Sequence, residues 1–164
     1  MDVEVFVEIC RESAVLPSYA REGDAGMDVC AAEEVLIKPG ETRVIPTGLK
    51  MAVPEGYEIQ IRPRSGLSLN TPLRISNSPG TIDSGYRDEI GIIVTNTSES
   101  TGCETSNATE SSSPGSTLKQ GDGALISGSI LTVESKGNIS GTYIIRKGDR
   151  IAQMVLQRVP RMKL

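Results

Sequence analysis

The segment GTIDSGYRDEIG, residues 80 to 91, contains a carboxylate that could take part in chemistry. Asp83 stands between an apolar residue and a Ser-Gly turn, and Tyr86 and Arg87 follow closely. The chain of 164 residues has no histidine, so a catalytic base must be a carboxylate, lysine, cysteine or tyrosine. An aspartate with a pKa near ~4 is ionised at neutral pH and can orient a water molecule by hydrogen bonding. Asp83 is therefore a candidate base, and its simpler alternative role is to close a β-turn.

A second polar segment, RPRSGLS at residues 62 to 68, is suited to an anion. In it, Arg64 and Ser65 stand next to Gly66. A guanidinium donates hydrogen bonds in a fork, and backbone N–H groups of a glycine-containing turn can form a concave anion site. The segment therefore suits an oxyanion or a phosphate, although it is equally compatible with the end of a strand.

Two more glycine-containing segments carry polar side chains. DAGMDVCA, residues 24 to 31, holds Asp24 and Asp28, which are also typical of turns and strand edges. GDRIAQMV, residues 148 to 155, is typical of a tight turn followed by a strand, and its alternation places the amide of Gln153 among apolar neighbours. Each segment alone is a weak indication of function.

The elements that would position these residues are strands, because the apolar residues repeat with a period of two. Residues 3 to 9 alternate strictly, which predicts a half-buried strand with Val3, Val5, Val7 and Ile9 on one face. The same period returns at Val35/Ile37, Met51/Val53, Tyr57/Ile59/Ile61, Ile90/Ile92/Val94 and Ile151/Gln153/Val155. Segments rich in glycine, proline, serine and asparagine separate these runs and supply turns. The pattern predicts an all-β barrel or sandwich with few, short helices.

Composition narrows the classes of partner. The formal charge is −4, with 17 Lys and Arg against 21 Asp and Glu, so no overall basic field favours nucleic acid or membrane. The absence of tryptophan and the presence of one phenylalanine exclude an aromatic platform for single-stranded nucleic acid. We therefore expect neither a nucleic-acid nor a membrane partner. A small anion bound by local arginines remains compatible with this charge.

Cysteine usage and the N-terminal residues predict the compartment. Cys10, Cys30 and Cys103 are odd in number and lack CxxC spacing, which favours neither a disulfide framework nor a thiolate metal site. The N-terminus lacks the pattern of a signal peptide, and no run approaches the ~20 apolar residues of a membrane span. We expect a soluble, cytoplasmic protein folded as a single domain over residues 1 to 164.

The composition changes between about Thr95 and Gly141, where serine, threonine and glycine dominate. Such a segment cannot repay the entropy of ordering itself, so residues 97 to 140 are predicted to form a flexible insertion within the domain. Two short apolar runs near its C-terminal end could form an added hairpin. The insertion is also a possible surface for a protein partner.

The four glycine-containing segments, in this order, resemble motifs one to four of the trimeric dUTP pyrophosphatase (dUTPase) family. The resemblance covers residues 1 to about 96 and 141 to 160. It implies a jelly-roll-like β protomer and a homotrimer with active sites at its subunit interfaces. It also implies Mg²⁺-dependent hydrolysis of dUTP to dUMP and pyrophosphate, which limits uracil in DNA and supplies dUMP.

The same resemblance implies a role for each matched residue. Asp83 would activate the water that attacks the α-phosphorus, and Tyr86 would lie against the deoxyribose and exclude a 2′-hydroxyl. The uracil-reading hairpin would comprise Asn77 and the backbone of Gly80, Thr81, Ile82 and Asp83. Arg64, Ser65 and Gly66 would hold the α- and β-phosphates, and Gln153 would contact another phosphate oxygen. Asp28 would hold a metal-bound water or a structural arginine, and Gly91 would be a substrate-adjacent position that contributes backbone only.

The sequence departs from the family pattern at two places. Asp88 stands where a glycine is usual after Arg87, and a Gly-rich fifth motif, which closes over the nucleotide in the family, does not follow RVPRMKL. We expect a truncated form of an ordinary enzyme rather than a naturally short variant. The first alternative is a non-catalytic or weakly active nucleotide-binding module with a regulatory or interaction role. The second is a dCTP deaminase relative, against which the GTID pattern and Tyr86 argue.

Overall fold

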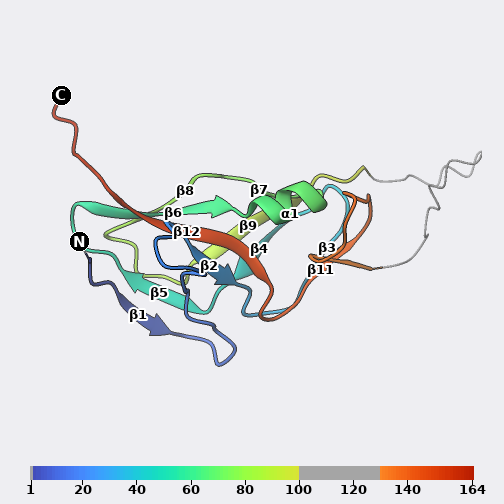
Figure 1. Cartoon of the computed structure of the whole chain (residues 1–164), viewed down its shortest axis with the longest axis horizontal. Coiled ribbons are helices and arrows are strands. Elements are labelled where there is room, and N and C mark those ends of the chain that lie inside the picture. Colours follow the sequence, from blue (N-terminus) through green and yellow to red (C-terminus); the bar gives the residue numbers. More distant parts are fainter. Residues whose placement is uncertain (1, 100–129) are drawn as a thin grey trace, which may run out of the picture.

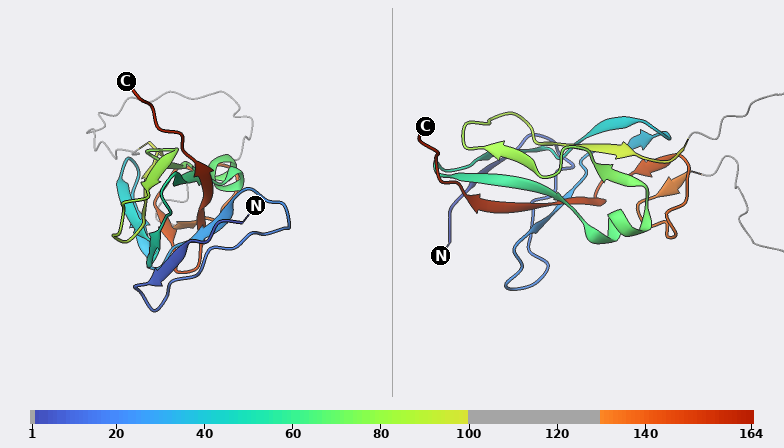
Figure 2. Two further views of the ribbon diagram at one scale, coloured as in Figure 1. Left: turned by 90° about the vertical axis from the view of Figure 1, so that its left-hand side faces the viewer. Right: turned by 90° about the horizontal axis from the view of Figure 1, so that it is seen from above.

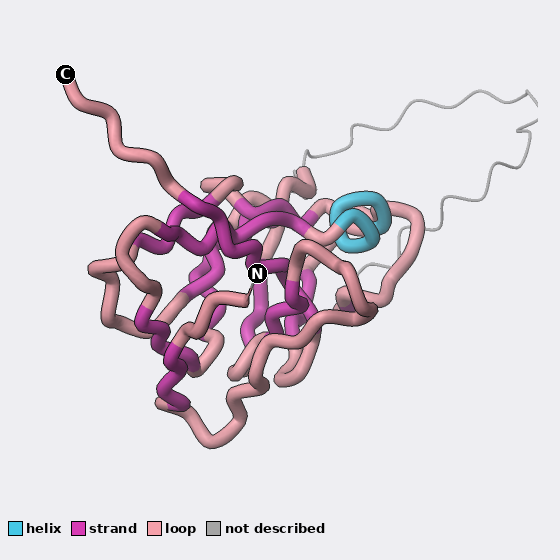
Figure 3. Tube along the Cα trace, turned by 60° about the vertical axis from the view of Figure 1, so that its left-hand side comes forward, coloured by secondary structure: helices cyan, strands magenta, loops and turns pink. Residues whose placement is uncertain are grey.

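The computed structural model describes residues 2–99 and 130–164 as strands and loops with one short helix (Figures 1 and 3). The elements are β1 (Phe6–Ile9), β2 (Met27–Cys30), β3 (Val35–Ile37), β4 (Thr42–Pro46), β5 (Leu49–Ala52), β6 (Tyr57–Pro63), α1 (Ser65–Asn70), β7 (Leu73–Ile75), β8 (Gly80–Asp83), β9 (Gly91–Asn96), β10 (Leu131–Thr132), β11 (Tyr143–Ile145) and β12 (Arg150–Arg158). The predicted all-β class with few, short helices is confirmed. In the described ranges no helix has the length and hydropathy that crossing a bilayer requires.

The sheet that carries most of the candidate residues has the order β2-β12-β6-β8 and is antiparallel throughout. β12 lies between β2 and β6, and a register shift between Arg150 and Ala152 interrupts its pairing with β2. Because of this irregularity, β12 does not keep strict alternation: Ile151 and Ala152, adjacent in sequence, are both fully buried. The alternation of residues 151 to 155 predicted a strand, and the structure places this strand in the interior of the sheet.

The remaining strands form three smaller sheets around a shared core, visible from two directions in Figure 2. Their orders are β4-β9-β7, β10-β11-β3 and β1-β5. Buried residues of different sheets, including Ile61 of β6, Ile92 of β9 and Tyr143 of β11, belong to a single hydrophobic cluster. This arrangement is the β-sandwich that the alternating pattern predicted.

The strand at the N-terminus differs from its prediction. β1 begins at Phe6, and all four of its residues are exposed in the single chain, including Ile9 at 53%. The predicted buried face is therefore wrong for Val7 and Ile9. The physical reason is that, among the described residues, β1 pairs with β5 alone and no second layer covers it.

The predicted flexible insertion falls mainly on residues 100–129, which lie outside the described residues, as does the first of its two apolar runs. The residues that flank the insertion, Asn96 and Gly141, are joined by a hydrogen bond. Asn96 donates from Nδ2 to the carbonyls of Ile37 (3.0 Å) and Gly141 (2.8 Å), and it is fully buried. The second apolar run contributes β10, which pairs in parallel with β11; the predicted hairpin between the two runs falls on residues outside the described ranges.

Candidate active site

Three charged side chains from distant parts of the sequence meet on β2, just after the end of β6 and at the start of β12. Arg64 donates from Nε to Oδ1 of Asp28 at 2.8 Å, and Arg150 approaches Oδ2 of the same carboxylate at 3.3 Å. Arg64 also donates to the backbone carbonyl of Arg150 at 3.3 Å. The side chain of Asp28 is only 13% exposed. Two roles were considered for Asp28, and its contacts in the structure fit the one in which it holds a structural arginine. The sequence assigned no role to Arg150.

Local backbone geometry brings these groups together. β6 ends at Pro63, Arg64 follows in extended conformation (φ −85°, ψ 130°), and α1 begins at Ser65. Gln153 pairs in register with Asp28 on one side and Arg62 on the other, so it shares a face of the sheet with Asp28. The sequence did not predict α1, because six residues are too few to show a helical period.

Two glycines of the motifs leave room for polar groups. A Cβ at Gly26 would lie 3.4 Å from Cβ of Gln153 and 3.5 Å from its Oε1, so the absence of a side chain gives the amide its place. A Cβ at Gly66 would meet nothing within 4 Å, and Ser65 beside it is exposed. The start of α1 is therefore open to a ligand.

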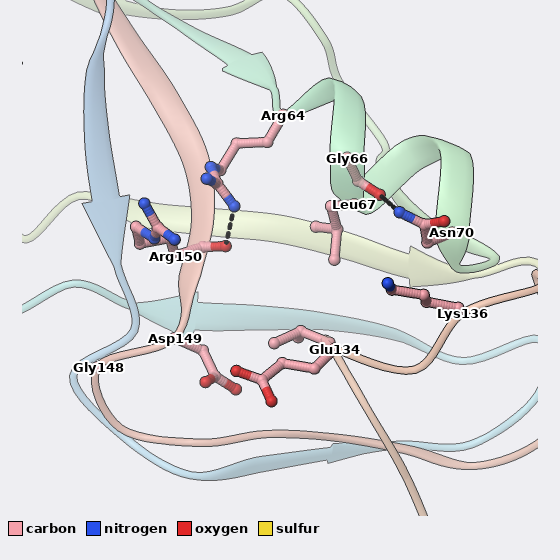
Figure 4. Close-up of a pocket in the computed structure, with 10 residues that line it drawn as sticks. Arg64, Gly66, Leu67, Asn70, Glu134, Lys136, Gly148, Asp149 and Arg150 are labelled. Atoms are coloured by element: carbon pink, nitrogen blue, oxygen red, sulfur yellow. Dashed lines mark hydrogen bonds between the residues drawn. The ribbon is translucent and has the colours of Figure 1, made fainter. Parts of the chain in front are cut away.

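Next to this cluster lies an open cavity of about 360 Å³, drawn in Figure 4. Its lining combines motifs two and four with the C-terminal part of the insertion: Arg64, Gly66, Leu67, Asn70, Val133, Glu134, Lys136, Gly148, Asp149 and Arg150. The insertion residues were missed by sequence reasoning, since a Ser/Thr/Gly-rich segment gives no sign of which residue faces a motif elsewhere in the chain. The composition of the cavity suits a small, highly charged ligand.

The remaining predicted residues lie on β8 and the loops on either side of it. A Cβ at Gly80 would stand 3.1 Å from Nδ2 of Asn77, so the asparagine amide folds over the backbone of this glycine. Gly80 is buried, Thr81 is exposed, and Ile82 packs partly against the core. The Asp83 side chain is exposed and has no hydrogen-bond or ion-pair partner in the described parts of the chain. It is therefore free to accept a hydrogen bond from water.

A tight turn places Tyr86 next to Asp83. The backbone N–H of Tyr86 donates to the carbonyl of Asp83 at 3.0 Å, and its phenol donates to the carbonyl of Glu89 at 2.9 Å. The tyrosine is thus anchored through its backbone and through its hydroxyl, while 38% of the residue stays exposed. An anchored, half-exposed ring is suited to contact a flat ligand surface.

The side chain of Glu89, whose backbone carbonyl accepts that hydrogen bond, is held in place by an ion pair with Arg11. Arg11 contacts both of its carboxylate oxygens, at 2.5 Å from Nε and 2.7 Å from NH2, and the N–H of Gly48 donates to it at 2.8 Å. The hydrogen bond from Arg11 is the main reason why the pKa of Glu89 lies below its ordinary value of 4.5. Gly91 lines a separate hollow beside this pair, and a Cβ there would come within 2.5 Å of Val44.

β8 runs alongside β6 and ends, at Asp83, near the start of β6, whereas α1 follows the end of β6 (Figure 1). Asp83 pairs in register with Glu58 near the start of β6, whereas Arg64 follows its last residue. Six residues of extended strand, at about 3.3 Å each, separate Asp83 from Arg64 by about 20 Å. One chain therefore brings Asp28, Arg64 and Gln153 together but does not bring Asp83 to them.

A metal site made by protein groups alone is not present in the described ranges, where no three His, Cys, Asp or Glu side chains gather. Both oxygens of Asp28 face arginines. Mg²⁺ that accompanies a nucleotide is usually held by phosphates, waters and one or two carboxylates, so this donor set is compatible with an ion carried by a ligand.

Comparison with known proteins gives a consistent result. A family model described as dUTPase matches residues 12–102. The deoxyuridine 5′-triphosphate nucleotidohydrolase of Clostridium novyi is 51% identical over 94 residues, and that of Leifsonia xyli is 54% identical over 85 residues. These alignments cover 57% and 52% of this chain and 66% and 56% of the relatives, so the chain spans less than two thirds of the curated relatives that it matches.

Solved structures extend the likeness beyond the family-model match, which ends before motif four. A dUTPase from phage phi11 of S. aureus, studied for its species-specific insert, has a TM-score of 0.77 at 28% identity and covers 99% of this chain and 94% of its own. The Staphylococcus bacteriophage 80alpha dUTPase with dUPNHPP has a TM-score of 0.76 at 28% identity, with coverage of 98% and 86%. A further phi11 variant structure concerns a structural Mg(II) ion.

Proposed function

Because the chain belongs to the dUTPase family, we propose that it hydrolyses dUTP to dUMP and pyrophosphate. The observation that carries the details of this proposal is the separation of Asp83 from Arg64 along β6. A site that needs both a water-orienting carboxylate and a phosphate-binding arginine is incomplete in one chain. We infer that Asp83 of one copy faces the Arg64 cluster of another.

A threefold ring of copies satisfies this requirement, because each contact joins two different surfaces and a closed ring repeats it at every interface. The exposed apolar residues of β1 support such an assembly, since Phe6 is 69% and Ile9 53% exposed in the single chain. Isolated chains would leave this surface in water. The proposed form is therefore a homotrimer with interface active sites.

In the proposed reaction, the carboxylate of Asp83 accepts a hydrogen bond from water and directs its oxygen to the α-phosphorus of dUTP, and it takes up the water proton as the new P–O bond forms. Pyrophosphate leaves with its electron pair, and the charge on the phosphate oxygens is stabilised by Arg64, Gln153 and the N–H groups of Ser65 and Gly66. Asp83 is exposed and without a partner in the described residues, so no existing contact has to break before it binds water.

Recognition of the base and sugar is assigned to the segment around β8. Asn77 and the backbone from Gly80 to Asp83 would present hydrogen-bond donors and acceptors that fit uracil. Cytosine would leave these groups unpaired, so the preference for uracil over cytosine would be ~10⁴-fold. The anchored ring of Tyr86 would contact the deoxyribose and leave no space for a 2′-hydroxyl. Gly91 faces the separate hollow with Val44, so its proposed part is limited to shaping the strand after this loop.

Mg²⁺ fits this proposal as an ion that arrives with the triphosphate. When bound, it would neutralise part of the phosphate charge. Asp28 would hold one of its waters through a free lone pair while keeping its arginines.

The direct test is pyrophosphate release from dUTP, dCTP, dTTP and UTP in the presence of Mg²⁺. We expect release from dUTP alone, and a ~10² to 10⁴-fold lower rate for Asp83→Asn with unchanged binding of a non-hydrolysable dUTP analogue. Equal rates in the two proteins would remove Asp83 from the mechanism. Tight analogue binding with no turnover in either protein would favour the alternative, a nucleotide-binding regulatory module whose partner surface is the insertion.

A further inference from the structure

We propose that Lys136, which lies on the described C-terminal part of the insertion, binds the terminal phosphates of the nucleotide. This inference rests on the proposed function and adds a residue from outside the motifs to the phosphate site. Lys136 lines the same cavity as Arg64, Gly66 and Arg150. In Figure 4 its ammonium group reaches into the cavity from the side of Asn70, and the two arginines enter from the opposite side.

The position of Lys136 is fixed by the backbone around it. The N–H of Asn138 donates to the carbonyl of Asn70 at 2.8 Å, which ties the turn after Lys136 to the end of α1. Before Lys136, a turn is closed by the N–H of Ser135, which donates to the carbonyl of Thr132 at 3.0 Å, and by the hydroxyl of Ser135, which accepts from the N–H of Thr132 at 3.0 Å. Lys136 is therefore held between two anchored points beside the phosphate-binding segment.

The charges around the cavity distinguish Lys136 from its neighbours. Arg64 and Arg150 share the carboxylate of Asp28, whereas Lys136 has no ion-pair partner within the described ranges. Of the two acids that line the cavity, Asp149 accepts the N–H of Arg146 at 2.8 Å, and Figure 4 shows Glu134 turned toward Asp149 rather than toward the lysine. As far as the described residues show, Lys136 is thus the cation of the cavity lining whose charge is still available to an anion.

The geometry favours the terminal phosphates over the α-phosphate. Arg64 and Gly66 flank one wall of the cavity and are assigned to the α- and β-phosphates, and Lys136 stands across the cavity from Arg64. A polyphosphate that extends from the arginine into the cavity would bring its last groups toward the lysine. A charge-assisted hydrogen bond of this kind is worth about 1.5–3 kcal/mol, which corresponds to a ~10 to 100-fold effect on affinity.

The test compares Lys136→Met with Lys147→Met. Lys147 is exposed in the turn before Gly148 and does not line the cavity, so its replacement makes the same change in net charge nearby. Binding of dUPNHPP, dUMP and inorganic triphosphate with Mg²⁺ is measured by calorimetry. We expect Lys136→Met to weaken dUPNHPP and inorganic triphosphate ~10-fold or more and to leave dUMP within ~2-fold. Lys147→Met should leave all three near wild-type values, and Lys136→Arg should retain most of the affinity.

The outcomes separate this inference from the proposed function. If the wild-type chain binds dUPNHPP and both Met variants bind it equally well, Lys136 is not a phosphate ligand and the proposed function stands. If the wild-type chain binds inorganic triphosphate through Lys136 but not dUPNHPP, the phosphate site stands and the nucleotide assignment is overturned. If it binds neither, both are overturned.

Discussion

Arg64 and Asp28 are joined by a hydrogen bond of 2.8 Å although 36 residues separate them in the sequence. The carboxylate lies on β2 and the guanidinium just after β6, and Arg150 of β12 approaches the second oxygen. Because Asp28 is largely buried and engages Nε of Arg64, the orientation of the guanidinium is set before any ligand arrives. Asp28 therefore acts through Arg64 as a positioning residue in this account.

Replacing Asp28 tests this role. Asp28→Asn keeps the shape of the side chain but removes the charge that orients Arg64, so we expect ~10-fold weaker nucleotide binding and a free energy of unfolding lower by about 1–3 kcal/mol. Asp24→Asn is the matched control, since the Asp24 carboxylate accepts the exposed N–H of Arg21 and no other hydrogen bond within the described residues, in a turn that tolerates asparagine. Calorimetry and urea unfolding at one protein concentration measure both quantities. Identical behaviour of the two variants would refute the positioning role.

Tyr86 combines an anchoring hydroxyl with a recognition surface, and two substitutions separate them. Tyr86→Phe loses the bond to the carbonyl of Glu89, so the free energy of unfolding should fall by about 0.5–1.5 kcal/mol while the preference for dUTP over UTP persists. Tyr86→Ala should also lose that preference by ~10-fold or more, because space opens for the 2′-hydroxyl. The ratio of kcat/KM for the two nucleotides is the readout, with Tyr19→Ala as a control at an exposed tyrosine. An unchanged ratio in Tyr86→Ala would exclude the sugar contact.

The Arg11–Glu89 pair predicts a pH dependence of stability. The pKa of Glu89 is lowered in the folded chain, so its contribution is complete above the ordinary value of 4.5 and is lost as the pH falls through the lowered folded value. At pH 7, Glu89→Gln should reduce the free energy of unfolding by about 1–2 kcal/mol. That difference should shrink as unfolding is measured at pH values falling below 4.5, where Glu89 becomes neutral first in the unfolded chain and, below its lowered pKa, also in the folded chain. A difference that is constant from pH 7 to pH 3 would show that the charge on Glu89 is unimportant.

The fold was predictable where a strand buries one face. Tyr57, Ile59 and Ile61 alternate in the sequence and lie in β6 with the two isoleucines in the core. β2 was not predicted, because Asp28 and Cys30 give its sequence the composition of a polar turn. The helix after Arg64 was not predicted either, because it is too short to show a helical repeat of apolar residues. Burial of Val7 and Ile9 was predicted from the same alternation, but alternation says nothing about which layer, or which copy, covers the face.

The site was predictable only as a set of residue types. Arg64, Asp28 and Gln153 stand in recognisable segments, and the structure brings these three together. Which groups pair depends on contacts between strands far apart in sequence, so neither the bond of Asp28 to Arg64 nor the place of Lys136 could be read from spacing. The separation of Asp83 from Arg64 likewise emerges only from the register of β8 on β6.

The central claim is that Asp83 and Arg64 of different copies form one site, and mixing two inactive variants tests it most directly. Asp83→Asn and Arg64→Gln are each purified, shown to assemble like the wild-type chain, and then co-refolded in equal amounts. Each required residue is intact in half of the chains, so about a quarter of the sites in randomly mixed assemblies should carry both, and dUTP hydrolysis should return to about that fraction of the wild-type rate. A mixture that assembles but stays as inactive as its components would contradict a site shared between copies.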